Sequence, residues 1–302
     1  MWRRCSSCLK SLGPSYIVTP ADASDLEPIL TFRDPQTPAE TPRPPQSERS
    51  FPAARSIVAL MLREMSTRYG RTPGGYIWAI AEPVGALIVL SFAFSLLLRT
   101  PSLGNSFILF YASGYLPFII DANIAAQVQS AIMFSKPLLQ YPAVSWIDAI
   151  LARFALNLLT GIALFCIVFT GVLQVTDTTV TLSLTPIVIA VAMAALLGLG
   201  IGTLNCLLVG LFPAWGNLWG IISRPMVLIA GVIFIYEDLP ALAQDIIWYL
   251  PWIHITGLAR TGVFPTYNPT YITLELVFVW ALVSLFLGLL LLRRHYKDIL
   301  NR

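Results

Sequence analysis

The side chains in this sequence that could do chemistry are few and widely separated. Four carboxylates lie within or beside long apolar stretches, namely Glu82, Asp121, Asp148 and Glu275. A proton-coupled carrier needs a relay of such groups deep inside a membrane bundle, but most of these lie near the ends of their stretches. A carrier of that kind, like an intramembrane enzyme, therefore stays a low-ranked alternative.

The motifs of known enzyme classes are missing from the sequence. It contains no H-E-x-x-H zinc motif and no G-x-S-x-G nucleophile motif, and its two histidines, His254 and His295, are far apart. It has no Walker A motif, so the chain cannot power transport with ATP by itself. Cys5 and Cys8 form an isolated C-x-x-C, which is a weak metal signal. We expect no catalytic residue, no metal and no cofactor in this chain.

Six apolar stretches after residue 76 are the elements that must position any functional side chain. Only 12% of the residues are charged, compared with about 25% in a soluble domain. A bilayer core requires about 20 apolar residues per helix, and in lipid a helix satisfies its own backbone hydrogen bonds. The sequence predicts an all-α integral membrane protein with six transmembrane helices, at about 77–98, 106–129, 149–173, 185–211, 217–236 and 270–292.

Residues 1–54 differ in kind from the rest of the chain. They contain nine prolines and little apolar periodicity, so they bury too little surface to fold alone. We expect a disordered proline-rich tail over 1–54, to which we assign no function, and a membrane domain over 55–302. The net charge of +3 is too small to indicate a nucleic-acid partner.

Residues 55–72 are predicted to form an amphipathic helix at the membrane interface. Ile57, Leu60, Met61 and Met65 fall near helical spacing, and the polar side is supplied by Arg55, Arg63, Glu64, Arg68 and Arg71. Such a helix lies with its basic face toward lipid headgroups. The alternative is a simple positively charged flank of the first span.

Lysine and arginine near the span ends predict which side each terminus occupies, because cytoplasmic loops are enriched in both. The segment before the first span, the region after the second span and the C-terminal tail carry most of them: Arg55, Arg63, Arg68, Arg71, Lys136, Arg153, Arg293, Arg294, Lys297 and Arg302. The opposite side has Arg99 and Arg260. We therefore expect both termini to be cytoplasmic.

Three features stay open at this point. Arg224 either snorkels to the cytoplasmic interface or faces the bundle interior. Residues 237–269 contain apolar stretches too short to span, which suits re-entrant or interfacial half-helices. Aromatic residues gather near the span ends, either as an interfacial belt or as a surface on which sugar rings stack.

Three stretches of the sequence carry recognisable motifs, which are LREMSTRYGR at 62–71, GYIWAIAEP at 75–83 and PWIHITGLARTGVF at 251–264. The first two together resemble the entry motif of type-2 ABC exporter permeases, specifically the subgroup that exports capsular polysaccharide and O-antigen. The third is similar to the segment before that family's last span. The resemblance covers about residues 55–300, and the proline-rich segment departs from the family pattern.

The resemblance implies a half-transporter that forms a homodimer and binds a separate cytoplasmic ABC ATPase, which would hold ATP and Mg. The helix at about 55–72 would be the interface helix, with Arg63, Arg68, Tyr69 and Arg71. The loop after the second span would touch the ATPase through Lys136, Pro137, Leu138, Gln140 and Tyr141. Residues 237–265 would form a periplasmic re-entrant pair. Candidates for the substrate channel are Trp78, Glu82, Tyr111, Tyr115, Phe118, Trp215, Trp219 and Arg260.

The predicted function is the permease subunit of an ATP-driven exporter in the bacterial inner membrane that moves a cell-surface polysaccharide. Capsular polysaccharide is favoured over O-antigen or teichoic acid, and an ABC-2 permease for a small molecule or drug is the alternative. The expected partners are the ATPase, a second copy of the chain, the polysaccharide, membrane lipid, and periplasmic or outer-membrane export proteins.

Overall fold

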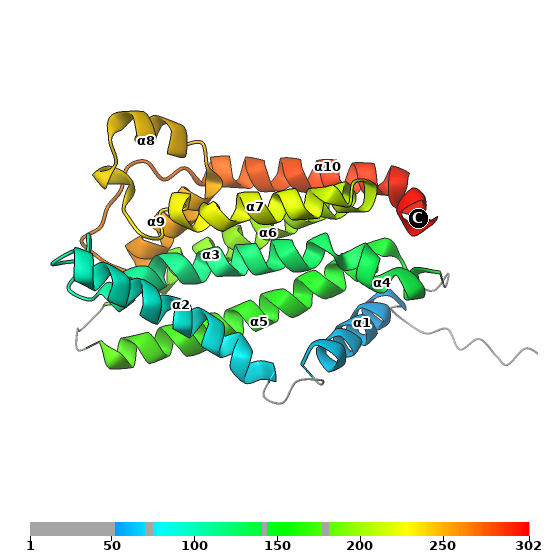
Figure 1. Ribbon diagram of the computed structural model, residues 1–302, viewed down its shortest axis with the longest axis horizontal. Coiled ribbons are helices and arrows are strands. Elements are labelled where there is room, and N and C mark those ends of the chain that lie inside the picture. The colour runs from blue at the N-terminus through cyan, green and yellow to red at the C-terminus, as the bar shows by residue number, and fades with distance from the viewer. Residues whose placement is uncertain (1–51, 70–74, 141–143, 177–180, 302) are drawn as a thin grey trace, which may run out of the picture. The chain divides into compact units, whose positions relative to one another are not determined.

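Helices form all the regular secondary structure in the part of the chain that the computed structural model describes, which is residues 52–69, 75–140, 144–176 and 181–301 (Figure 1). The prediction of an all-α protein is confirmed for these residues. The predicted tail lies outside the described residues except for 52–54. With these three residues the first helix, α1 (Pro52–Tyr69), begins.

Among the described residues, five helices are long and apolar enough to cross a membrane. The shortest has 23 residues, which at about 1.5 Å per residue exceeds the roughly 30 Å of a hydrocarbon core. α3 also continues past Ser130 into a short helix, α4 (Ala131–Leu139). The five are α2 (Gly75–Leu97), α3 (Phe107–Gln129), α5 (Trp146–Val175), α6 (Leu184–Leu211) and α10 (Leu274–Asn301).

The predicted span at 217–236 is not confirmed as one membrane-crossing helix. Here α7 (Ala214–Ile229) has only 16 residues, about 24 Å of helix. Gly231 follows with a φ of 71°, a left-handed conformation that ends helices and that glycine adopts without a steric cost. The chain then continues without helix as far as residue 235, with Val232 fully buried.

Arg260 supplies the hydrogen bonds that this non-helical segment lacks. Its side chain is 1% exposed, and it donates to the carbonyl oxygens of Val232 and Phe234, both at 2.8 Å. The guanidinium also lies 4.2 Å from the ring centroid of Phe110 on α3. Buried backbone carbonyls require partners, so Arg260 stabilises the place where α7 stops.

Short helices occupy the segment that was predicted to hold half-helices. They are η1 (Tyr236–Asp238), α8 (Ala241–Ile247) and α9 (Pro251–Val263). α9 is buried along almost its whole length and packs on α3 and α6. α8 is different, because Leu242 and Ile246 are largely exposed.

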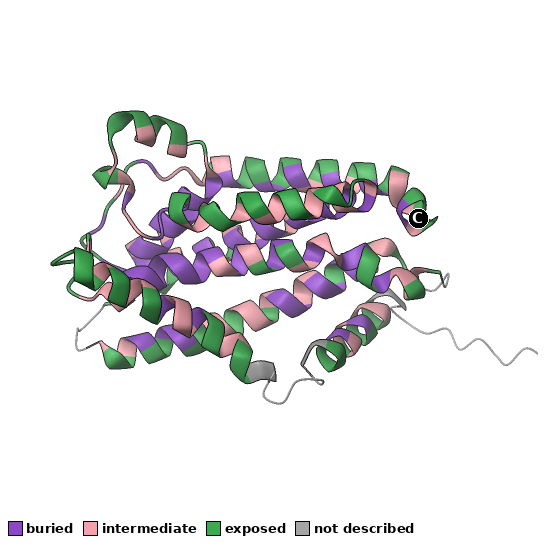
Figure 2. Cartoon of the chain, in the orientation of Figure 1, coloured by how far each residue is buried: buried purple, intermediate pink, exposed green. Residues whose placement is uncertain are grey.

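α6 is the centre of the packing and contacts α3, α9 and α10 (Figures 1 and 2). A Cβ added at Gly198 would lie 2.7 Å from the carbonyl oxygen of Asp121 on α3. A Cβ at Gly200 would lie 2.5 Å from the carbonyl oxygen of Ala281 on α10. Small residues let membrane helices approach this closely, so α6 can hold two neighbours at once.

A change of Gly200→Ala should destabilise the bundle. The added methyl would overlap the backbone of α10, and overpacking of this kind costs about 1–3 kcal/mol. We expect a lower thermal unfolding midpoint for the purified protein in detergent. Gly85→Ala is the matched control, because nothing lies within 4 Å of its Cβ position. An unchanged midpoint for Gly200→Ala would show that α6 and α10 are farther apart than described.

Candidate functional site

α5 begins at a capping box that also binds α1. The Ile147 amide donates to Ser145 Oγ at 3.4 Å, and the Ser145 amide donates to Asp148 Oδ2 at 3.1 Å. This reciprocal pattern satisfies amides that have no partner inside the helix. Ser56 Oγ of α1 donates to the same Asp148 oxygen at 3.1 Å. Asp148, which the sequence presented as a carboxylate at the start of a span, therefore caps α5 and binds α1.

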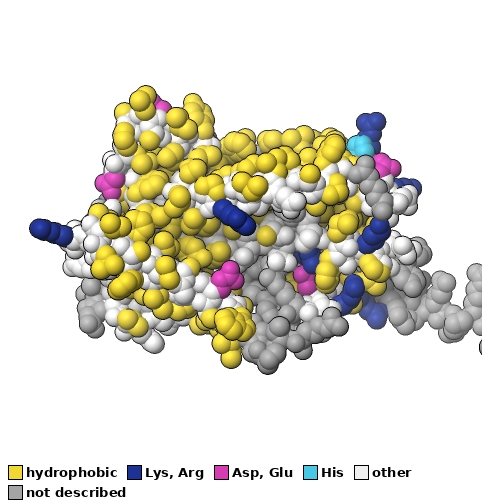
Figure 3. Space-filling model, viewed as in Figure 1, with side chains coloured by type: hydrophobic (Ala, Val, Ile, Leu, Met, Phe, Trp, Pro, Cys, Tyr) yellow, Lys and Arg dark blue, Asp and Glu magenta, His cyan; other side chains and the backbone are white. Residues whose placement is uncertain are grey.

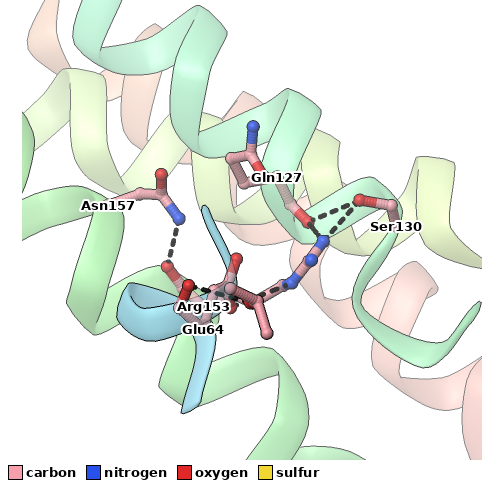
Figure 4. A network of polar contacts seen from close by, with 6 residues as sticks. Glu64, Gln127, Ser130, Arg153 and Asn157 are labelled. Atoms are coloured by element: carbon pink, nitrogen blue, oxygen red, sulfur yellow. Dashed lines mark hydrogen bonds and ion pairs between the residues drawn. The ribbon is translucent and has the colours of Figure 1, made fainter. Parts of the chain in front are cut away.

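A buried ion pair lies less than two turns farther along α5 (Figure 4). Arg153 Nε is 3.2 Å from Glu64 Oε2 of α1, and both side chains are only 5–6% exposed. Arg153 Nη1 also donates to the Gln127 carbonyl oxygen at 2.7 Å and to Ser130 Oγ. Desolvating each ion costs several kcal/mol. The arginine is therefore stable here because acceptors from α1, from α3 and from Ser130 converge on it.

Phe134 of α4 contacts two arginines at the same junction. The Arg153 guanidinium carbon lies 4.3 Å from the ring centroid, and that of Arg63 lies 5.4 Å from it. A guanidinium over an aromatic face is attractive. α4 is therefore connected both to α1, through Arg63, and to α5, through Arg153. We call α1, α4, the first two turns of α5 and Ser130 the junction.

The structure corrects the conformation of the predicted ATPase-coupling segment. Lys136, Pro137 and Leu138 lie on the helix α4 rather than in a loop, and Gln140 follows directly after it. Tyr141 lies outside the described residues. The helix presents an exposed Met133 next to the ring of Phe134.

A helix, α1, is present where the interface helix was predicted, with bounds that differ from 55–72; its location at the membrane interface stays a prediction. Arg63 packs on Phe134. The side chains of Arg68 and Tyr69, and the whole of Arg71, lie outside the described residues. Sequence reasoning placed Glu64 on the polar side and missed its role. The sequence did hold one signal: Glu64 follows Leu60 by four residues, so both lie on the same face of α1, and both are buried.

A cavity of about 510 Å³ lies between α2, α3, α6, α7 and α9, and its largely apolar wall carries several polar side chains. Its lining includes three of the predicted channel residues, Glu82, Phe118 and Trp219. It also includes polar side chains that were not predicted to share a site: Asp121, Asn123, Gln129, Ser223, Arg224 and Trp252. The cavity is within the range of about 300–1,000 Å³ that is usual for binding sites.

The other predicted channel residues lie elsewhere. Tyr111 and Tyr115 are buried in the core, where Tyr111 packs on neighbouring phenylalanines. Trp78 is 71% exposed on α2. Trp215 donates from Nε1 to Asn205 Oδ1 at 2.9 Å, and Arg260 binds the backbone after α7. None of these five lines the cavity in this structure.

An aromatic cluster joins η1 to the segment that leads into α10, outside the five long helices. Tyr236 stacks on Tyr271 with ring centroids 4.2 Å apart, and Tyr267 Oη donates to Glu237 Oε2 at 3.0 Å. Burial raises the pKa of Tyr271 to about 12 and also raises the pKa of Tyr267. Both hydroxyls therefore stay protonated near pH 7 and act as hydrogen-bond donors.

His254 on α9 is held as a neutral ring. Its Nδ1 accepts from the Thr273 amide at 3.2 Å, which leaves Nε2 to carry the proton and donate to the Trp248 carbonyl oxygen at 2.8 Å. Burial lowers the pKa of His254. Each ring nitrogen is therefore used in a structural contact, and neither is available to act on a substrate.

Comparison with protein families decides the class of this bundle. The family model described as ABC-2 type transporter matches residues 55–264, which runs from α1 through α9 and covers well over half of the chain. The chain belongs to the ABC-2 type transporter family. The predicted family is thereby confirmed, and the junction and the cavity both lie within the matched region.

The chain is also similar to curated transport proteins of three bacteria. It is 28% identical over 246 residues to the polysialic acid transport protein KpsM of Escherichia coli, covering 82% of this chain and 95% of KpsM. The capsule polysaccharide export inner-membrane protein BexB of Haemophilus influenzae is 28% identical, with 81% and 92% covered. The capsule polysaccharide export inner-membrane protein CtrC of Neisseria meningitidis serogroup A is 26% identical, again with 81% and 92% covered.

A change of Glu64→Gln should destabilise this family member through the junction. It removes the negative charge that faces Arg153 in the buried pair, and breaking a buried pair from one side costs about 3 kcal/mol or more. We expect a clearly lower unfolding midpoint. Glu275→Gln, at an exposed position, should stay within about 0.5 kcal/mol of the parent.

The double variant Glu64→Gln/Arg153→Met tests whether the loss of stability in Glu64→Gln comes from the charge that remains on Arg153. It removes both ions, so it should be more stable than Glu64→Gln alone. A double variant less stable than the single one would contradict the assignment of a desolvated, mutually dependent pair.

Proposed function

We propose that the chain is the inner-membrane permease subunit of an ATP-driven exporter of capsular polysaccharide. The observation that carries this proposal is the match to KpsM, BexB and CtrC, which spans more than nine-tenths of each relative. The family places the chain among ABC-2 transporters, and the sequence has no Walker A motif. The energy would therefore come from a separate ATPase subunit.

The distribution of charge supports a cytoplasmic location for the junction. α1 packs on α5, and α10 contacts α4. Near the C-terminal end of α10, Tyr296 stacks on Trp146, the first residue of α5, with ring centroids 6.2 Å apart. This end carries Arg63, Lys136 and the basic residues at the end of α10. Basic residues are enriched on the cytoplasmic side, so both termini would lie in the cytoplasm.

Both termini lie on one side only if the chain crosses the membrane an even number of times. Five long helices give an odd number, and α7 with the non-helical residues up to 235 would provide the sixth crossing. Irregular backbone is tolerated at membrane depth where protein surrounds it. Val232 is fully buried and Arg260 binds its carbonyl oxygen, which meets that condition. α8 and α9 would then lie toward the periplasm.

The junction has the features of a docking surface for the ATPase. α4 presents Met133 and Phe134, which are 53% and 37% exposed, beside the side chain of Lys136. A partner that moved α4 would act on Arg153 through the ring of Phe134, and on α1 through Arg63. The substrate would cross along a path formed with a second copy of the chain.

The function is tested by deleting the gene and measuring polysaccharide on the cell surface. Deletion should remove the surface polysaccharide and leave polymer inside the cell, and a plasmid copy should restore the surface layer. Normal surface polysaccharide in the deletion strain, together with altered sensitivity to small toxic molecules, would instead favour drug efflux.

The docking surface is tested by Lys136→Glu. Reversing this charge should lower the amount of ATPase that co-purifies with the permease severalfold, because interfacial charges set partner complementarity. Arg99→Glu is the control, since it makes the same kind of charge reversal in the connection between α2 and α3, away from the junction. Equal recovery of ATPase with both variants would contradict docking at α4.

A further inference from the structure

Two acceptor atoms of side chains that line the cavity have no hydrogen-bond donor among the described residues. Asp121 is 4% exposed; its Oδ2 accepts from Trp252 Nε1 at 2.6 Å, but its Oδ1 is buried without a partner in that part of the chain. Gln129 Oε1 is also buried without a hydrogen-bond partner in that part of the chain. An unsatisfied buried acceptor costs about 1–3 kcal/mol. Both side chains line the cavity, so a ligand there could supply the missing donors.

The spacing of these residues gives the site an elongated form. Asp121 and Gln129 are eight residues apart on α3, which places them on one face about 12 Å apart along the axis. From α7, Trp219 and Ser223 line the cavity one turn apart. A ligand in the cavity would meet acceptor oxygens on α3 and an aromatic face on α7. Sugars carry hydroxyl donors and apolar ring faces, which suit both surfaces.

Arg224 adds a positive charge to the cavity lining. It is the one basic residue of α7, it is exposed, and it makes no hydrogen bond or ion pair within the described ranges. Figure 3 shows that hydrophobic side chains cover most of the face that it draws. An arginine at mid-membrane costs about 2.5–3.5 kcal/mol if it faces lipid. The cost for Arg224 is lower if its guanidinium faces water in the cavity and binds an anionic group there.

We propose that this cavity binds a short stretch of acidic polymer in transit. Hydroxyl groups of neighbouring sugar units donate to Asp121 Oδ1 and Gln129 Oε1, one ring lies on Trp219, and Arg224 binds a carboxylate or phosphate. The proposal rests on the proposed function, because the exported polymer supplies the ligand. An anionic lipid headgroup offers Arg224 the same chemistry, so the experiment must separate polymer from lipid.

The test uses thiol labelling at position 223 in living cells. Ser223→Cys is made in a full-length chain in which the four native cysteines are replaced by serine or alanine. The probe is the anionic reagent methanethiosulfonate ethylsulfonate, applied to cells that make the polymer and to cells blocked in its synthesis. We expect labelling of the introduced thiol to fall severalfold when polymer is made. Ser102→Cys in the same cysteine-free chain, exposed in the connection between α2 and α3, reports labelling outside the cavity and should not change.

Arg224 and Gln129 variants test the proposed contacts. Arg224→Gln and Gln129→Leu should abolish the protection by polymer and reduce surface polysaccharide about tenfold, whereas Arg224→Lys should keep part of both effects. Gln129 is only half-buried, so its variant is informative even if a change at Asp121 prevents folding.

Three results would overturn the proposal. The first is equal labelling of Ser223→Cys with and without polymer, which is also what a bound lipid headgroup would give. The second is an unreactive thiol in both strains, and the third is full protection in Arg224→Gln. If the deletion strain keeps its surface polysaccharide, the proposed function itself is wrong. If deletion removes it while Arg224→Gln exports normally, only the sugar site is wrong.

Discussion

Arg153 lies buried at the start of α5, and the charge that faces it, Glu64, comes from a separate helix. The pair is desolvated, with 3.2 Å between the charged atoms, and Arg153 also donates to Gln127 and Ser130, where α3 ends. Removing either ion takes the opposite charge away from the other. This constraint fixes α1 against α5 and against the break between α3 and α4. A force on α4 would therefore act on the start of a long membrane helix.

The same α3 helix connects the junction to the cavity. At the C-terminal end of α3, Gln127 and Ser130 accept hydrogen bonds from Arg153. Gln129, which lies between these two residues in the sequence, lines the cavity. Farther along, Asp121 accepts from Trp252 of α9 while its backbone packs against Gly198 of α6. A shift of α3 at the junction would move both cavity acceptors with it. This would link ATP-driven motion of the partner to the site that we propose binds the polymer.

The sequence predicted the membrane class, four of the helices within a few residues, and the family, because apolar length and local motifs carry that information. It did not predict that α7 stops at Ile229, since a continuous apolar run hides the turn at Gly231. Nor did it identify Glu64, because its partner is 89 residues away and a helical pattern shows which face a residue occupies but not what covers it. Asp121 and Arg224 were visible as charges in apolar surroundings. That they share one cavity depends on how α3 and α7 pack, which spacing alone does not reveal.

The central claim is that the Glu64–Arg153 pair connects ATP hydrolysis to movement of the polymer. The most direct measurement is the amount of polysaccharide exported per ATP hydrolysed by the permease–ATPase complex in proteoliposomes, at a temperature where the Glu64→Gln variant is still folded. The account predicts that this variant assembles with the ATPase and hydrolyses ATP, but exports far less polymer per ATP than the parent. An unchanged ratio would contradict it.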